Sequence, residues 1–234
     1  MNPHTDPLQH LRDHGPGYGI RLSEEQIRLF RIYLEELVQW NRRMNLTGLS
    51  TPERIVNELF LDSLVPVPFL PGEGRLLDVG SGAGIPGLLI RIYHPRLEVH
   101  LLEPRAKRVS FLRQVIRLLG LKGIEVLQGR LETDRGGLPL RRYPVITSRA
   151  LAGLSQTVVL CGPLVLPGGL LVCYLGRGAD GLLDETGPVL GVQRLVLHRR
   201  IPYSLPGKEG ERNVMIFKKR GDNEDFTQRP DHRP

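Results

Sequence analysis

The spacing of hydrophobic residues differs between the part of the chain before residue 72 and the part after it. Between Ser23 and Met44 apolar side chains recur every three or four positions, which predicts one long amphipathic helix. Ser23 and Gln26 have the spacing of a capping box at its start. A second helix start follows at Thr51-Pro52, where a capping residue precedes a proline. These signals predict a small N-terminal helical region over residues 23–72.

Beyond residue 72, short apolar runs alternate with stretches of helical spacing, which is typical of an α/β domain with a mostly parallel sheet covered on both faces. The last two apolar runs leave no room for a helix between them, so they should form an antiparallel hairpin at one edge of the sheet. We predict one such domain over residues 73–219. Its seven strands are expected at residues 75–80, 99–103, 124–128, 145–149, 170–175, 192–201 and 213–219. Its helices are expected at residues 85–93, 105–119 and 154–164.

Both ends of the chain lack hydrophobic periodicity. Residues 1–22 contain several Pro, Gly and His residues, and residues 220–234 are almost entirely polar. Such composition favours disordered tails.

The net charge says more about possible partners than the composition does. The 234 residues are 40% hydrophobic and 24% charged, as in many globular proteins, but the net charge is +7. This balance favours an anionic partner, and nucleic acid is the commonest large one. A basic surface without such a partner is the alternative.

The two cysteines, Cys161 and Cys173, lie far apart in apolar runs and indicate buried thiols in a reducing cytoplasm. Neither belongs to a zinc-ligand pattern, and we predict no metal site. The sequence has no apolar stretch of membrane-spanning length and no signal-peptide core, so we expect a cytoplasmic protein without a membrane partner.

The turn after the first predicted strand has two interpretations. Starting at Gly82 it reads G-x-G-x-x-G, the pattern of dinucleotide-binding proteins, and starting at Asp78 it reads D-V-G-S-G-A-G, an acid followed by a glycine turn. The dinucleotide pattern starts two residues after the strand ends at Gly80, and Pro86 removes an N–H group from the phosphate cradle. Asp78 would also repel a pyrophosphate.

An acid at Asp78 suits a ligand with positive groups, such as S-adenosylmethionine, although this carboxylate could instead cap nearby N–H groups. Glu103, at the end of the second strand, can accept both ribose hydroxyls of either cofactor. The turn therefore favours the methyl donor, with a nicotinamide-dependent oxidoreductase as the alternative.

Six short motifs in order resemble the ribosomal RNA small-subunit methyltransferase G family, also called glucose-inhibited division protein B. The motifs are MNLT (44–47), LDS (61–63), DVGSGAGIPG (78–87), KRVSFLRQV (107–115), GRLE (129–132) and SRA (148–150). The resemblance covers about Leu34 to Lys219 and implies a Rossmann-like class I methyltransferase fold. It also implies methylation of guanine N7 in small-subunit ribosomal RNA, as free RNA or as a ribosomal particle, with S-adenosylmethionine as the methyl donor.

The resemblance also implies site residues. The family's cofactor contacts fall on Gly80, Ile85, Glu103 and the pair Leu131-Glu132, and Gly82 lies in the same turn. Arg149 matches an arginine near the cofactor and the target base, so it is the catalytic and cofactor-binding candidate, with a structural ion pair to a nearby carboxylate such as Glu132 as the alternative. Arg212 matches an arginine before the last strand.

Three departures from the family pattern affect positions expected to contact the substrate. Glu58-Leu59 stand where the family usually has Arg-His, Leu175 stands at a usual lysine, and Tyr143-Pro144 replace Phe-Asp. Arg177 is a candidate to supply the missing positive charge. A chain that binds the methyl donor but has lost the RNA activity is therefore a further alternative.

The chemistry around the fourth strand agrees with a ring nitrogen as the target. Guanine N7 has a free lone pair and no proton, so its attack needs no general base. The sequence Ser148-Arg149-Ala150 replaces the Asn/Asp-Pro-Pro-Tyr/Phe signature of exocyclic-amine methyltransferases, and neither cysteine is placed as a nucleophile. For the RNA, the candidates on one predicted helix are Arg105, Lys107, Arg108, Arg113 and Arg117, with a plain solvated face as the alternative.

Overall fold

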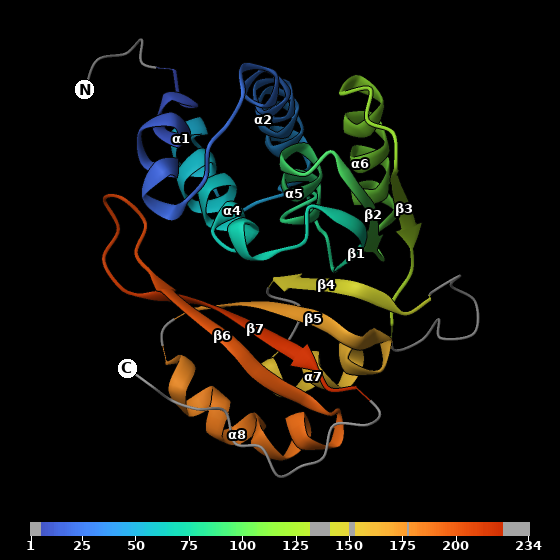
Figure 1. Ribbon diagram of the computed structural model, residues 1–234. Helices are drawn as coiled ribbons and strands as arrows, with labels where there is room; N and C mark the ends of the chain where they lie inside the picture. The colour runs from blue at the N-terminus through green and yellow to red at the C-terminus, as the bar shows by residue number, and fades with distance from the viewer. Residues whose placement is uncertain (1–5, 132–140, 150–152, 177, 222–234) are drawn as a thin grey trace.

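A computed structural model describes residues 6–131, 141–149, 153–176 and 178–221 (Figure 1). Its centre is a seven-stranded sheet in the order β3-β2-β1-β4-β5-β7-β6. The strands from β1 to β5 run parallel, and β7 lies between β5 and β6, antiparallel to both. The predicted mostly parallel sheet with an antiparallel edge hairpin is confirmed. The strands are β1 (Glu73–Val79), β2 (Arg96–Glu103), β3 (Ile124–Gln128), β4 (Tyr143–Arg149), β5 (Val165–Leu175), β6 (Leu195–Tyr203) and β7 (Arg212–Lys219).

Helices cover both faces of this sheet (Figure 1). On one face, α5 (Gly87–Tyr93) and α6 (Ala106–Leu118) share a hydrophobic core with the N-terminal helices, and Leu76 of β1 points into this core. On the other face, α7 (Leu154–Cys161), the short η4 (Gly162–Leu164) and α8 (Ala179–Val192) pack over a second core, into which the next residue, Leu77, points. This alternation is expected because successive side chains of a strand point to opposite faces of the sheet.

Helix α8 was not predicted. Its sequence contains Gly181, Gly187 and Gly191, and Pro188 lies inside the helix. Glycine and proline are the poorest helix formers, so local propensity opposes this element. Burial of Ala179 and Leu190 in the second core shows that tertiary packing compensates.

The N-terminal helical region forms as the spacing predicted. Helix α2 (Glu24–Met44) begins with a complete capping box, in which Ser23 Oγ accepts from Gln26 N and Gln26 Oε1 accepts from Ser23 N. The α3 helix (Pro52–Ile55), the π-helical segment η2 (Val56–Leu61), α4 (Asp62–Leu64) and η3 (Val67–Phe69) follow. These elements join the α5–α6 core instead of forming one of their own. Within the described residues, no helix has the length and hydropathy needed to cross a membrane.

The prediction of disorder over residues 1–22 is wrong for the part that the structure describes. Residues from Asp6 onward include α1 (Gln9–His14) and η1 (Gly15–Tyr18), and the side chains of Leu8, Leu11 and Ile20 are at most 1% exposed. Their partners lie in the core beneath, so local periodicity could not reveal them.

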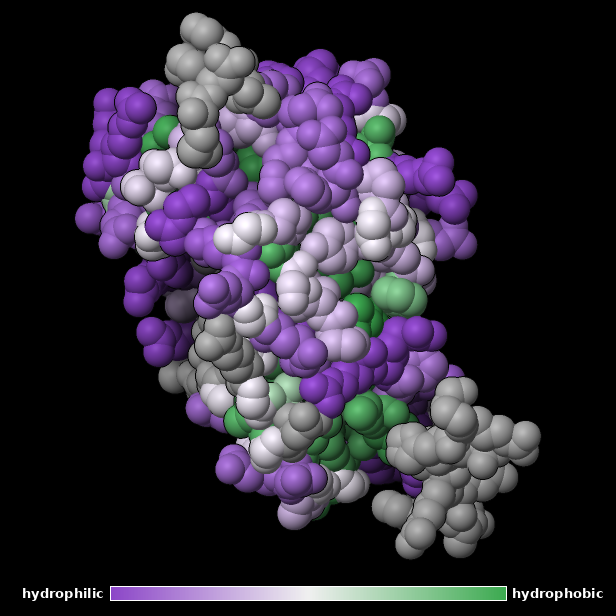
Figure 2. All heavy atoms as spheres, turned by 90° about the vertical axis from the view of Figure 1, so that its left-hand side faces the viewer, coloured by the Kyte–Doolittle hydropathy of each residue, from purple (hydrophilic) through white to green (hydrophobic). Residues whose placement is uncertain are grey.

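Seen from the side of α1, hydrophilic side chains cover most of the surface over the N-terminal helices (Figure 2). Residues 1–5 and 222–234 lie outside the described residues.

Candidate functional site

The glycine turn between β1 and α5 places backbone where no side chain would fit. Gly84 has φ +89°, and a Cβ there would lie 2.9 Å from Leu112 Cδ2. A Cβ on Gly87 would lie 2.5 Å from Leu101 Cδ2 and 2.7 Å from Asp78 Cβ. From the other side, the buried Tyr33 hydroxyl of α2 donates to Ala83 O. The turn is thus fixed by close packing against α6, β1, β2 and the N-terminal helical region.

Asp78 lies beneath this turn. Its side chain is fully buried, and it accepts hydrogen bonds from Gly87 N at 3.1 Å and from the Thr147 hydroxyl at 2.8 Å. Burial raises the pKa of this carboxyl to about 6, because the charged form loses its water, while the two hydrogen bonds act in the opposite direction. Asp78 is not among the residues that line the adjacent pocket. The hydrogen bond from Gly87 N is the capping contact that the sequence left as an alternative, and the cofactor contact of Asp78 stays a prediction.

A pocket of about 250 Å³ opens at the carboxyl ends of β1, β2 and β3. Glu103, which is 2% exposed, forms part of its wall. Glu103 Oε2 accepts from Gly82 N at 2.8 Å and Oε1 accepts from Arg105 N at 2.9 Å, so one carboxylate joins the glycine turn to the start of α6. The residues that line the pocket are Val79, Gly80, Leu102, Glu103, Pro104, Arg105, Arg108, Gly129, Arg130, Leu131 and Leu160.

The pocket brings together part of the predicted cofactor set. Gly80, Glu103 and Leu131 line it, and Gly82 reaches it through its bond to Glu103. Ile85 is 8% exposed and packs in the core instead of lining the pocket. Glu132 lies outside the described residues.

Six lining residues were not predicted: Val79, Leu102, Pro104, Gly129, Arg130 and Leu160. Arg130 directly precedes the predicted contacts Leu131 and Glu132 in the GRLE motif, so its charge just after β3 was a usable signal. Leu160 comes from α7, far along the chain, and only the fold brings it here. With Arg105 and Arg108, the pocket wall contains three arginines and one carboxylate, which suits a ligand that has both hydroxyl and anionic groups.

Arg149, at the end of β4, points toward the N-terminal helical region and is not among the pocket-lining residues. Its Nη2 lies 3.0 Å from Asp62 Oδ2 and donates to Glu58 O at 2.9 Å, and its Nη1 lies 3.5 Å from Ser63 Oγ. The alternative of an ion pair is thus observed, with Asp62 as the partner. The proposed partner Glu132 is outside the described residues.

Asp62 connects the ends of several strands. Its side chain is 2% exposed, and Oδ1 accepts from Arg212 Nη1 at 2.9 Å and from the Tyr203 hydroxyl at 2.8 Å. Tyr174, at the end of β5, donates to Ser63 O at 2.8 Å. Burial raises the pKa of both tyrosines, so these hydroxyls remain protonated donors. Asp62 and Ser63 of the LDS motif, Arg149 of the SRA motif and Arg212, far apart in the sequence, meet here.

The five cations proposed for RNA on α6 separate into two groups. Arg105 and Arg108 line the pocket, and Lys107 is exposed beside them. Arg113 and Arg117 line a separate hollow near the other end of the helix, together with Ile124 of β3. The remaining candidates are Arg212, which pairs with Asp62, and Arg177, which lies outside the described residues.

Comparisons with known proteins agree on one family. A family model described as GidB, rRNA small subunit methyltransferase G, matches residues 26–194. The chain is 37% identical to the ribosomal RNA small subunit methyltransferase G of Moorella thermoacetica over 205 residues, 86% of this chain and 85% of that protein. It is also 37% identical to the protein of the same name from Chromobacterium violaceum over 196 residues, 84% of this chain and 90% of that protein.

Solved structures of lower identity share the fold. A methyltransferase from Pyrococcus furiosus aligns with a TM-score of 0.57 and 18% identity, over 81% of this chain and 97% of that one. A ribosomal protein L11 methylase from Lactobacillus delbrueckii subsp. bulgaricus aligns with a TM-score of 0.55 and 12% identity, over 75% of this chain and 81% of that one. The class I methyltransferase fold predicted from the sequence is confirmed.

Proposed function

The chain belongs to the family of rRNA small subunit methyltransferase G, and we propose that it transfers a methyl group from S-adenosylmethionine to N7 of a guanine in small-subunit ribosomal RNA. The substrate is the free RNA or a ribosomal particle. The observation that carries the proposal is the pocket at the carboxyl ends of β1 and β2, where a parallel sheet binds its ligands.

The residues of this pocket fit the methyl donor. Each Glu103 oxygen accepts one backbone N–H group and keeps a second lone pair, so the carboxylate can still accept ribose hydroxyls. Leu102, Leu131 and Leu160 provide an apolar wall for an adenine ring. Arg105, Arg108 and Arg130 can bind the carboxylate of the methionine part.

The residues near the site favour positioning over acid–base or covalent catalysis. S-adenosylmethionine supplies a sulfonium methyl group, which a ring nitrogen takes up with its free lone pair. Cys161 and Cys173 are buried, and burial raises the pKa of both thiols, that of Cys161 to about 12. Since a thiolate is the nucleophilic form, neither cysteine suits covalent catalysis. Holding two reactants in line can supply several kcal/mol without a base.

Arg149 and Arg212 are the residues that we assign to the target base or its phosphate. Both form ion pairs with the same buried carboxylate, that of Asp62, which holds their guanidinium groups near each other. A guanidinium has five N–H donors, so each keeps donors for a ligand. Their position at the ends of β4 and β7, on the same edge of the sheet as the pocket, suits a nucleotide placed beside the methyl donor.

Binding of the cofactor is the first test. We expect calorimetry to show S-adenosylmethionine binding to the wild-type chain and at least roughly tenfold weaker binding to Gly82→Val. Gly82 has φ +58°, where a β-branched residue is strained, and its N–H group holds Glu103. As a control, Gly181→Val in α8 changes a glycine whose Cβ would meet nothing within 4 Å, far along the chain from the turn.

Transfer itself is tested with radiolabelled methyl donor and small-subunit RNA from a strain that lacks the gene, followed by mapping of the modified base. Label on N7 of one guanine supports the proposal. Tight NADH binding without any response to the methyl donor would show that the nicotinamide alternative was correct.

A further inference from the structure

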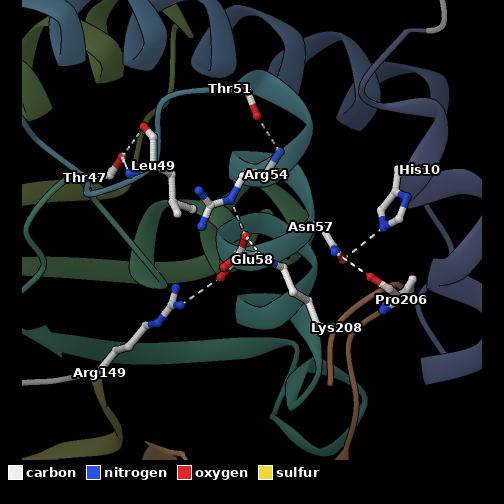
Figure 3. A network of polar contacts seen from close by, with 10 residues as sticks. All are labelled: His10, Thr47, Leu49, Thr51, Arg54, Asn57, Glu58, Arg149, Pro206 and Lys208. Carbon is white, nitrogen blue, oxygen red and sulfur yellow. Dashed lines mark hydrogen bonds and ion pairs between the residues drawn. The ribbon is translucent and has the colours of Figure 1, made fainter. Parts of the chain in front are cut away.

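The loop between β6 and β7, residues 204–211, is fastened to two consecutive residues of η2 (Figure 3). Asn57 Nδ2 donates to Pro206 O at 2.8 Å, and Glu58 Oε1 lies 2.9 Å from Lys208 Nζ. Asn57 Oδ1 lies 3.0 Å from His10 Nε2 of α1, so the same residue also contacts the N-terminal segment. The loop therefore rests on the N-terminal helical region instead of extending freely from the sheet.

Glu58 is the centre of this contact. Its Oε1 also lies 2.8 Å from Arg54 Nε, one helical turn earlier. The Glu58 side chain is 13% exposed, compared with 48% for Arg54 and 37% for Lys208. A charged hydrogen bond to a shielded carboxylate stabilises a contact more than an ion pair in open water does.

The backbone of Glu58 contacts the candidate site directly. Its carbonyl oxygen accepts from Arg149 Nη2 at 2.9 Å, while the side chain holds Lys208 (Figure 3). The same residue thus contacts Arg149 and the β6–β7 loop.

The two ends of that loop also lead to the site. Tyr203 precedes it and Arg212 follows it, and both donate to Asp62. Displacement of the loop would therefore move Arg212 relative to Asp62 and Arg149. A shift of about 1 Å in positioning groups can lower a rate by up to about a hundredfold.

We propose that Glu58 is a positioning residue, which holds the β6–β7 loop on η2 through Lys208 and thereby keeps Arg149 and Arg212 in register. The proposal rests on the function proposed above. Glu58 stands at one of the positions where the sequence departs from the expected family pattern. Glu58 itself contacts neither reactant.

A carboxylate close to an RNA-binding site can also repel RNA phosphates, and the test must distinguish this repulsion from positioning of the loop. If Glu58 acted only as a negative charge, its removal would reduce repulsion of RNA phosphates, and the KM for RNA would fall with kcat unchanged. If it positions the loop, kcat falls and KM does not.

The experiment uses the full chain, small-subunit RNA and S-adenosylmethionine, with kcat and KM measured for Glu58→Gln, Lys208→Gln and the double variant. We expect each single variant to lower kcat roughly tenfold, the loss of about one charge-assisted hydrogen bond. The double variant should be no worse than either single variant, because both remove the same contact. The matched control is Arg54→Gln. It removes the ion pair between Arg54 and the Glu58 side chain but keeps the ion pair between Glu58 and Lys208, so kcat should stay within about twofold of the wild type.

Hydrogen exchange provides a readout that does not depend on catalysis. Amides of residues 204–211 should exchange faster in Glu58→Gln and Lys208→Gln than in the wild type or in Arg54→Gln. A lower KM with unchanged kcat, or a lower kcat without faster exchange in the loop, would overturn the proposal. A wild-type chain that binds the methyl donor but methylates no RNA would instead overturn the proposed function, and exchange would still report whether Glu58 holds the loop.

Discussion

Asp78 shows how one buried carboxylate can hold a turn through its backbone. It accepts a hydrogen bond from the N–H group of Gly87, and Gly87 has no room for a Cβ because Asp78 and Leu101 lie there. Asp78 and Gly87 therefore depend on each other. The sequence identified both as part of one motif, but whether the carboxylate pointed toward a ligand or toward the backbone depended on packing.

The raised pKa of Asp78 predicts a pH dependence of stability. The folded state keeps a proton up to about pH 6, whereas the ordinary value is 3.8, so between these pH values the folded state binds more protons than the unfolded state. The contribution of this group to the free energy of unfolding therefore falls as the pH rises through that window, by about 3 kcal/mol in total.

Asp78→Asn removes this titration and can keep both hydrogen bonds, because its amide oxygen can accept from Gly87 N and its NH₂ group can donate to Thr147. We expect the unfolding free energy of the variant, relative to the wild type, to rise by about 2 kcal/mol between roughly pH 4 and pH 7. Urea unfolding at a series of pH values measures it. A difference that stays constant over this range would contradict the assignment.

At the scale of elements, hydrophobic spacing predicted most of the fold. The α2 helix has its capping box and a one-sided apolar face, and each early strand is a short buried run, so local signals and tertiary structure agree. They disagree at α8, where glycines and Pro188 oppose a helix that packing stabilises. In the same way, Gly80 and Glu103 could be predicted to meet because parallel strands end at one edge, but Asp62 and Arg149, 87 residues apart, could not.

The α6 helix leads to a prediction about RNA. Arg113 and Arg117 are exposed, and among the described residues no ion pair neutralises either of them. Arg117 donates a hydrogen bond to the uncharged Gln114. If both bind phosphates, replacing them with Gln should reduce the slope of log affinity against log salt by about one to two units.

The control for this prediction is the pair Arg28→Gln and Arg31→Gln on α2, which changes the net charge equally. These two arginines already pair with Glu25 and Asp6, so the slope should change less. Equal slopes for the α6 variant and the wild type would mean that this end of α6 is a solvated face.

For the whole molecule, the N-terminal segment belongs to the common core. Leu11 of α1 is 1% exposed, and its core also includes residues of α2, α5 and α6. We expect Leu11→Ala to lower the free energy of unfolding by about 2 kcal/mol or more, through lost burial and the resulting cavity.

Leu118→Ala on α6 is the matched control, because this leucine is 45% exposed and should cost less than about 0.5 kcal/mol. Denaturant unfolding of both variants gives the comparison. Equal, small losses would restore the prediction that the segment before Ser23 is a disordered tail.

The position of β7 has a consequence for how the chain is made. Among the strands of the described residues, β6 pairs only with β7, and β7 also pairs with the free edge of β5. Since a polypeptide is synthesised from its N-terminus, β5 and β6 both expose unpaired edges until residues 212–219 have left the ribosome. Arg212 is the first residue of that strand, so the Asp62 cluster gains its second arginine at the same moment as the sheet closes. A chain truncated before residue 212 would present two unpaired strand edges, which favour aggregation, and an Asp62 cluster without Arg212. Premature termination is therefore expected to cause aggregation as well as loss of activity.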